Sequence, residues 1–431
     1  MLLLRPLRQT PRAATAALNA STARACAPRS SSNVAFSFRR AYAARGAPAT
    51  FPTIDTCPSP TCSCAPTPSF PQGFEIDHTT PLNGLMPAHA QQVLICTGKD
   101  DWPSKIEDDN DGQNHAAMLR DLIGRGGPYS DPFHNISVLN VSFPPSSSSS
   151  SSPPSANQNT KNTSIYLLPD FKYLPAVSSS PDHLKALVKA HLLPEKLHPV
   201  HDHSPPAKRE ALLRDPSYAD QIPGPGIRDI RNEVIVLICG HGGRDQRCGV
   251  YGPLLRGEFE KRLAESSSTT GEGRGQLEKI HVLKGAAAAP ADQQLDHARN
   301  GEESSKAWGA RVGLISHIGG HKFAGNVIVY IPPGLKLSGS DAPHPLAGHG
   351  IWYGRVEPKH VEGIVKETIK KGNVIKELFR GAIKRGVGEK PQLHSRIQIE
   401  PKPKQKVVHS WTYASADCLG VHKETPTTLF I

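Results

Sequence analysis

Two cysteines and two histidines in this chain have the residue types and spacing of a metal site. Eight residues separate Cys239 from Cys248, and Ile-Gly-Gly separates His317 from His321. Thiolates and imidazoles together bind zinc, or a cluster of two irons in which histidines replace the cysteines of one iron. Structural zinc usually takes cysteines roughly two to four residues apart, because one tight turn supplies both. The wider spacing favours the two-iron cluster, and zinc stays the alternative.

The two histidines are expected on a loop. Histidines four residues apart can share one helix face, as they do in zinc hydrolases. Here two adjacent glycines separate them, and each glycine costs a helix roughly 1 kcal/mol relative to alanine. No glutamate follows His317 to act as a general base. A glycine-rich loop instead lets backbone amides point at a charged cluster.

Two strands must bring these pairs together. Apolar runs at 234–238 and 312–315 end just before each pair, as expected of buried strands. After a ligand loop, apolar residues every four positions predict a helix over 251–264, although Gly257 weakens the pattern. Further strands are expected at 280–283, 327–331 and 350–353, and a closing helix at 358–371. This order predicts a small α/β sandwich of thioredoxin type.

The first half of the chain repeats this pattern without the second cysteine. Strands are expected at 92–96, 136–143 and 165–168, and helices at 115–123 and from 183. The tetrapeptide Val-Leu-Ile-Cys occurs at 93–96 and again at 236–239. The fold class is therefore predicted as α/β, with two thioredoxin-like domains of which the second carries the metal site.

Composition sets the expected boundaries. Serines at 146–152 and an alanine-rich polar stretch at 285–306 indicate low-complexity insertions. The expected divisions are a presequence at 1–50, a degenerate thioredoxin-like domain at 73–200, a linker at 201–229, a thioredoxin-like ferredoxin domain at 230–385 and a C-terminal extension at 386–431.

The basic charge of the chain is concentrated at its start. The 431 residues carry a net charge of +11, but residues 1–54 contain eight arginines and no acidic residue. The remainder holds 42 basic and 39 acidic residues, so no nucleic-acid partner is indicated. An arginine-rich, acid-free start is typical of a mitochondrial transit peptide. We therefore expect a mitochondrial protein, in the matrix, with no membrane span.

The spacing of the cysteines and histidines resembles the sucrase/ferredoxin-like family, in particular its fungal branch named for altered inheritance of mitochondria. The segments at 82–87, 101–104 and 350–356 are similar to that family as well. The resemblance implies a [2Fe–2S] cluster, with Cys239 and Cys248 on one iron and His317 and His321 on the other. It implies one-electron transfer in redox homeostasis, with a redox partner protein that the sequence does not name.

Other residues leave alternatives open. The chain is either this electron carrier, a zinc-stabilised binding module, or a thiol–disulfide oxidoreductase using Cys96 or the group Cys57, Cys62 and Cys64. No nucleophile–base pair is evident, so no catalysed reaction is assigned. His241 either tunes the cluster or faces water, and Arg244 and Arg247 either offset its charge or are solvated. Cys418 receives no role.

Overall fold

The computed structural model describes residues 51–61, 63–146, 162–224, 226–265, 280–283, 308–337, 341–384 and 392–394. Contacts divide the chain into one unit at Met1–Ala44 and a second at Arg45–Ile431, and every described residue belongs to the second. The presequence, the insertion at 285–306, all but Ser146 of the insertion at 146–152 and most of the C-terminal extension, with Cys62 and Cys418, lie outside the described residues. No helix within the described ranges combines the length and apolar character needed to cross a membrane.

The second half of the chain places its core strands in the order β9-β7-β10-β11. β7 and β9 are parallel, and β10 and β11 each run antiparallel to the preceding neighbour. α4 follows β7, and α6 follows β11 and continues into the π-helical turns of η6. β8, β13 and β14 extend this part of the sheet. The bounds are β7 Glu233–Cys239, α4 Gln246–Glu265, β8 Ile280–Val282, β9 Trp308–Ile315, β10 Val327–Tyr330, β11 His349–Tyr353, α6 Pro358–Gly363, η6 Ile364–Lys370, β13 Phe379–Lys384 and β14 Gln392–His394.

The first half uses the same order, β3-β2-β4-β5. β2 and β3 are parallel, whereas β4 and β5 are antiparallel to their neighbours. α1 connects β2 to β3, and α2 follows β5. The bounds are β2 Gln91–Cys96, α1 His115–Ile123, β3 Ile136–Val141, β4 Asn162–Leu168, β5 Lys172–Ser178 and α2 Pro181–Leu187.

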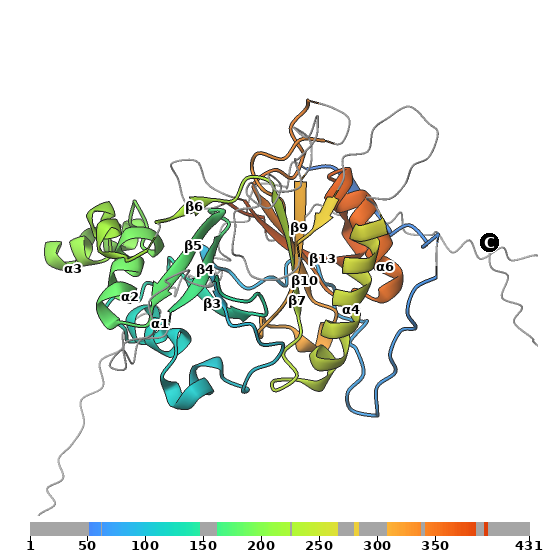
Figure 1. Ribbon diagram of the computed structural model, residues 1–431, viewed down its shortest axis with the longest axis horizontal. Coiled ribbons are helices and arrows are strands. Elements are labelled where there is room, and N and C mark those ends of the chain that lie inside the picture. The colour runs from blue at the N-terminus through green and yellow to red at the C-terminus, as the bar shows by residue number, and fades with distance from the viewer. Residues whose placement is uncertain are drawn as a thin grey trace, which may run out of the picture. The chain divides into compact units, whose positions relative to one another are not determined.

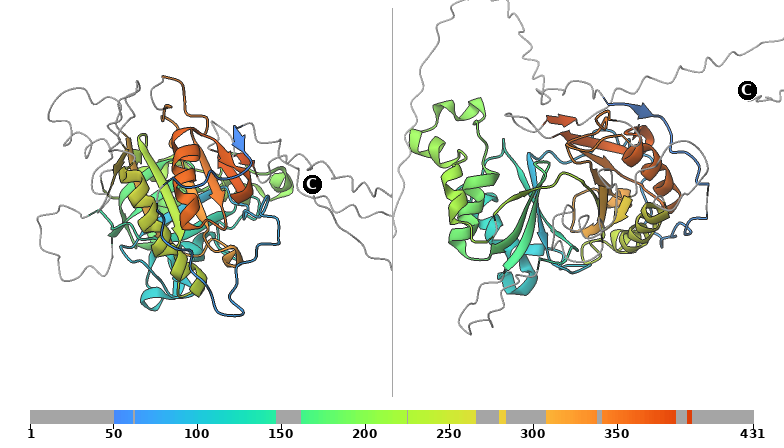
Figure 2. Two further views of the ribbon diagram at one scale, coloured as in Figure 1. Left: turned by 90° about the vertical axis from the view of Figure 1, so that its right-hand side faces the viewer. Right: turned by 45° about the horizontal axis from the view of Figure 1, so that its top comes forward.

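Both halves thus match the thioredoxin-type order expected from the sequence, and the α/β prediction is confirmed. The repeated tetrapeptides lie in β2 and β7, the first core strand of each half. Figure 1 shows α1 and α2 beside the strands of the first half and α4 and α6 beside those of the second. Figure 2 shows α4 and α6 together on one face of the second half. The proposed domain boundaries stay a prediction.

The two halves join into one sheet where β3 meets β9. The two strands are antiparallel and pair through Val141 and Ile315, the last residue of each. Ser142 and Ser316 follow these residues and make reciprocal bonds. Each serine amide donates to a carbonyl of the opposite strand, at 2.9 Å for Ser142 and 3.0 Å for Ser316. Each serine Oγ in turn accepts a backbone N–H from that opposite strand. Ser142 Oγ accepts from Leu314 at 2.9 Å, and Ser316 Oγ accepts from Asn140 at 3.0 Å. The junction therefore relates the halves by an approximate two-fold axis.

Three further segments complete the described fold. The described residues of 201–229, predicted as a linker, contain short helical elements and a strand. The residues from 51 to 72 that the structure describes include β1, which pairs with β12, and they then cross α6 and α4. β13 was not predicted. The additional bounds are β1 Thr53–Ile54, η1 Ile106–Gly112, η2 Val188–Leu192, η3 Pro199–His203, α3 Pro206–Ala211, η4 Pro216–Gln221, β6 Arg228–Asp229, η5 His321–Phe323, β12 Val374–Ile375 and η7 Lys376–Leu378.

Candidate metal centre

Both predicted cysteine ligands are buried and free. Cys239 is the last residue of β7, and Cys248 is the third residue of α4. The expectation that Cys248 lies on a loop ahead of the helix is wrong, because α4 begins at Gln246, five residues before the predicted start. A cysteine in the first turn of a helix lies at the positive end of the helix dipole, which favours its thiolate.

Glycines allow the two cysteine segments to approach each other. A Cβ atom added to Gly252 of α4 would lie 2.4 Å from the Cα of Gly240, which follows Cys239. One added to Gly249 would lie 2.8 Å from the Cα of Gly242. Real Cβ atoms do not come this close to backbone, so any larger residue would separate the segments. The glycines therefore bring Cys248 against Cys239.

The two thiols and the ring of His317 affect one another. A hydrogen bond from Cys248 holds the pKa of Cys239 well below the ordinary thiol range, and the ring of His317 lowers it further against the effect of burial. The same bond, together with burial, raises the pKa of Cys248. The two sulfurs are therefore close enough to interact directly, and a metal ion that bound both would displace their protons.

The histidine loop lies beside these thiols. His317 follows β9 by two residues and contacts Cys239, while His321 begins the short turn η5. The two imidazole rings are 5.4 Å apart between centroids. Gly319 and Gly320 have φ angles of 83° and 78°, a left-handed conformation that glycine adopts without strain. The prediction of a loop rather than a helix is confirmed.

The arrangement fits a metal-bound state in one specific respect. The Nδ1 atoms of His317 and His321 are both buried and have no hydrogen-bond partner among the described residues. A buried nitrogen without a partner costs roughly 1–3 kcal/mol, and ligation would satisfy it. Taken as they stand, however, the described side chains include no group of three or more His, Cys, Asp or Glu residues gathered closely enough to hold one metal ion.

His241 lies inside the cysteine loop and is buried, so the alternative that it faces water is wrong. Its Nδ1 accepts the backbone N–H of His317 at 3.0 Å. Its Nε2 donates to the carbonyl oxygens of Trp102 and Pro103, at 3.1 and 2.8 Å. The Asp101 carboxylate accepts the Gly243 N–H at 3.0 Å. A segment of the first half thereby fixes the ligand loops of the second.

One buried cation on which the charges of the cysteines act was not predicted from the sequence. Arg247 forms an ion pair with Asp245 at 2.9 Å, and Arg244 is exposed and donates to Ser104 at 3.2 Å. Arg380 on β13 is buried instead, and the charges of Cys239 and Cys248 act on it. No sequence signal marks Arg380, because it lies 59 residues beyond His321 on an unpredicted strand.

The remaining cysteines are placed apart from these ligands. Cys96 is buried at the end of β2, and burial raises the pKa of its thiol. Cys57 donates to the carbonyl of His360 at 3.5 Å, and burial followed by nearby glutamates raises its pKa to about 12. Cys64 is partly buried. Thiol–disulfide chemistry requires an accessible thiolate, which neither Cys57 nor Cys96 offers.

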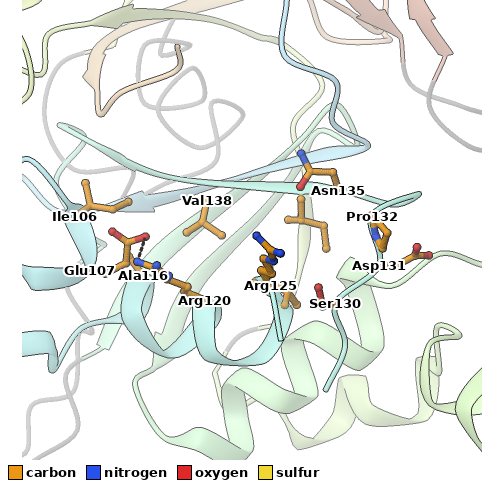
Figure 3. A pocket seen from close by; sticks show the side chains of 13 residues that line it. Ile106, Glu107, Ala116, Arg120, Arg125, Ser130, Asp131, Pro132, Asn135 and Val138 are labelled. Carbon is orange, nitrogen blue, oxygen red and sulfur yellow. Dashed lines mark ion pairs between the residues drawn. The ribbon is translucent and has the colours of Figure 1, made fainter. Parts of the chain in front are cut away.

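A separate hollow of 560 Å³ lies between α1 and β3 (Figure 3), and none of the four predicted ligands lines it. Arg120 forms an ion pair with Glu107 at 3.1 Å across its wall. Asp131 pairs with His201 at 3.1 Å. The charges of Glu107, Arg120 and Asp131 are therefore partnered within the fold.

Comparisons with known proteins identify the sequences that this chain resembles. The model of the sucrase/ferredoxin-like family matches residues 82–381. Altered inheritance of mitochondria protein 32 of Meyerozyma guilliermondii is 28% identical over 338 residues, which cover 77% of this chain and 95% of that protein. The protein of the same name from Debaryomyces hansenii is 28% identical over 341 residues, with 77% and 96% covered. Actin patches distal protein 1 of Saccharomyces cerevisiae is 26% identical over 302 residues, with 69% and 74% covered. No solved structure matches.

Proposed function

Because this chain belongs to the sucrase/ferredoxin-like family, we propose that it is a [2Fe–2S] protein that transfers single electrons. Cys239 and Cys248 would hold one iron, and His317 and His321 the other. When bound, the cluster supplies a one-electron redox couple. The protein residues would position it, exclude water and set its potential.

The pairwise arrangement of the four side chains carries this proposal. The thiols contact each other, the imidazoles lie together, and Cys239 touches His317 where the pairs meet. A core of two irons needs two neighbouring pairs of ligands rather than four ligands converging on one point. The unpartnered Nδ1 atoms of both histidines support the same assignment.

Neutral imidazoles make the core less negative than four thiolates would. We therefore propose a reduction potential above that of an all-cysteine cluster. A ligating imidazole keeps a second nitrogen that can exchange a proton with solvent, which would couple electron transfer to pH. Voltammetry between pH 6 and pH 9 tests this part, because a potential that stays constant would eliminate proton coupling.

We also propose a mitochondrial location, in the matrix. The acid-free, arginine-rich start of the chain supports it, and so do the names of the fungal relatives. A fluorescent fusion of residues 1–50, followed by protease protection of isolated mitochondria and mitoplasts, would show whether the segment directs import to the matrix.

The deciding experiment is chemical analysis of protein purified without oxygen. The proposal predicts a coloured protein with two irons and two acid-labile sulfides per chain. A colourless protein with one zinc would establish the binding-module alternative. A colourless, metal-free protein with reactive thiols would instead favour a thiol–disulfide oxidoreductase.

A further inference from the structure

Arg380 is a buried cation whose hydrogen bonds all go to neutral oxygens. Its Nη1 donates to the Asn326 side chain at 2.6 Å and to the Gly319 carbonyl at 3.3 Å, and its Nη2 donates to the Leu85 carbonyl at 2.7 Å. The side chain is 1% exposed. No carboxylate of the described residues forms an ion pair with it. An uncompensated buried charge is expensive, so a negative partner is expected.

A second buried arginine shows what the usual solution looks like. Arg311 on β9 is also 1% exposed, and its Nε donates to the Glu233 carboxylate at 2.6 Å. That carboxylate, together with Tyr166, keeps the pKa of Arg311 high in spite of burial. Burial lowers the pKa of Arg380 to about 10, and the opposing negative charges are those of Cys239 and Cys248. Among the described residues, the negative charges that act on Arg380 are therefore those of the two cysteines rather than that of a carboxylate.

Arg380 also contacts the backbone between the two histidines. A Cβ atom added to Gly320 would lie 2.7 Å from Nη2 of Arg380, and Gly319 supplies one of the accepting carbonyls. Asn326, which accepts from Arg380, donates in turn to the Gly320 carbonyl at 2.9 Å. The guanidinium thus holds the histidine loop, and it lies close enough to the two cysteines for their charges to act on it.

We propose that Arg380 positions the His317–His321 loop and favours the reduced state of the metal centre through its fixed charge. This inference rests on the proposed function. Two ferric ions, two sulfides, two thiolates and two neutral imidazoles sum to zero charge, so one added electron leaves a net negative core. A buried cation that lacks a carboxylate partner stabilises that electron without first having to break an ion pair.

The test compares two charge-altering variants with a matched control. Arg380→Met removes the charge, and Asn326→Asp keeps Arg380 but places a carboxylate against its Nη1. Both should lower the equilibrium constant for reduction by about tenfold, or 59 mV for a one-electron couple. Arg380→Lys keeps the charge and should shift the constant less. Lys322→Met is the control, because Lys322 adjoins His321 but is exposed and already paired with Asp77 at 2.8 Å.

Iron and sulfide analysis accompanies each potential, so the possible failures differ. Wild-type protein without iron and sulfide would refute the proposed function itself. Loaded Arg380→Met and Asn326→Asp proteins with the wild-type potential would overturn the role of Arg380 alone. If Arg380→Met takes up no cluster, Asn326→Asp decides: a lowered potential supports the inference, and an unchanged one rejects it. A shift in Lys322→Met as large as in Arg380→Met would also reject it.

Discussion

Cys96 and Cys239 occupy the same place in the two halves of the molecule, yet their surroundings give them opposite chemistry. Each ends the first core strand, and each pairs with the last residue of the adjoining parallel strand, Val141 or Ile315. Both are buried. Burial raises the pKa of Cys96 in spite of the opposing charge of Arg311, whereas Cys248 and His317 lower the pKa of Cys239 despite burial. The position of a cysteine in the fold therefore does not by itself create a candidate metal site. The side chains beside the cysteine do.

The equivalent neighbours in the first half lack ligand atoms. The third residue of α1 is Ala117, where α4 has Cys248. Phe143 lies two residues after the end of β3, and His317 lies at the equivalent position two residues after the end of β9. Phe143 packs edge-on against Tyr166 at 5.7 Å between centroids, and the guanidinium of Arg311 lies 5.5 Å from its ring. One half fills this position with an aromatic side chain, and the other places there a histidine that is a candidate metal ligand.

The two halves nevertheless depend on each other. The segment after β2 supplies Asp101, Trp102 and Pro103, which bind the loop around His241. Asp100 adds an ion pair to Arg256 on α4, at 2.6 Å. The first half, which lacks the cysteine and histidine pairs, thus forms part of the wall of the candidate site in the second half.

Substituting Cys239 and Cys96 tests the difference between the two halves most directly. Cys239→Ala should abolish the visible absorption of the purified protein, because no described residue replaces that thiolate. Cys96→Ala should keep the absorption and cost only about 1 kcal/mol of stability, as expected of a small truncation in the core. Absorption spectra and urea denaturation of both variants measure this. Equal loss of colour in the two would contradict the assignment.

His241 tests the dependence of one half on the other. His241→Ala removes a buried ring and leaves the carbonyls of Trp102 and Pro103 and the amide of His317 without their partner. We expect a loss of about 4 kcal/mol and reduced cluster content. Urea denaturation and iron analysis are the measurements.

Two milder changes separate the contacts of His241. The side-chain oxygen of His241→Asn can still accept the His317 N–H, but the shorter side chain cannot reach the Trp102 carbonyl. The longer side chain of His241→Gln instead places its NH₂ donor near the Trp102 and Pro103 carbonyls. If only His241→Asn retains iron, the hydrogen bond to His317 within the second half matters more. If only His241→Gln retains iron, the hydrogen bonds to Trp102 and Pro103 of the first half are decisive. Wild-type stability and iron content in His241→Ala would refute both roles.

Acid should expose a further difference between the halves. His344 in the second half accepts the Leu346 N–H at Nδ1 and donates from Nε2 to Ile369, so it folds as the neutral ring. Burial lowers its pKa to about 4. Stability is therefore complete above pH 6.5 and declines as the pH falls towards 4, by on the order of 3 kcal/mol.

His344→Gln cannot titrate and should lose less stability than the wild-type protein between pH 7 and pH 5. In the first half, burial also lowers the pKa of His115, whose Nε2 lies 3.0 Å from the Val177 carbonyl. Thermal unfolding of His344→Gln and His115→Gln as a function of pH shows whether the halves unfold together. Identical pH curves for His344→Gln and wild type would contradict a role for His344.

The smallest effect distinguishes the two faces of α4. Gly257 is exposed, and nothing lies within 4 Å of a Cβ atom built there. Gly257→Ala should stabilise the protein by about 0.5–1 kcal/mol and leave the cluster intact. Gly252→Ala, on the face towards Cys239, should destabilise it and lower the iron content. Chemical denaturation measures both, and a destabilising Gly257→Ala would show that this turn of the helix is constrained.

Sequence periodicity and spacing predicted much of this molecule. β2, β7, α1 and the left-handed turn at Gly319 and Gly320 were predictable because local pattern and backbone preference decide them. The start of α4 was not, since Gly249 and Pro253 obscure its first turns. The bridge from His241 to Trp102 was not either, because residues about 140 positions apart meet only after the sheet has formed.

The edge of the sheet was harder to predict than its centre. Phe379–Lys384 contains an arginine and a glycine among its apolar residues, so it lacks the continuous apolar run that marks β7. Arg380 can be buried there because the Gly319 carbonyl, the Asn326 side chain and the Leu85 carbonyl accept its hydrogen bonds. The usual preference of arginine for the surface would place Arg380 in solvent, and only the three-dimensional structure shows that its side chain is buried.

Mössbauer spectroscopy of the ⁵⁷Fe-reconstituted, one-electron-reduced protein tests the ligand assignment most directly. With Cys239 and Cys248 on one iron and His317 and His321 on the other, the two irons must differ. The spectrum should contain one ferric and one ferrous component of equal area, with the ferrous iron showing the larger isomer shift expected of nitrogen ligation. Two equivalent irons, or a single mononuclear site, would contradict the account.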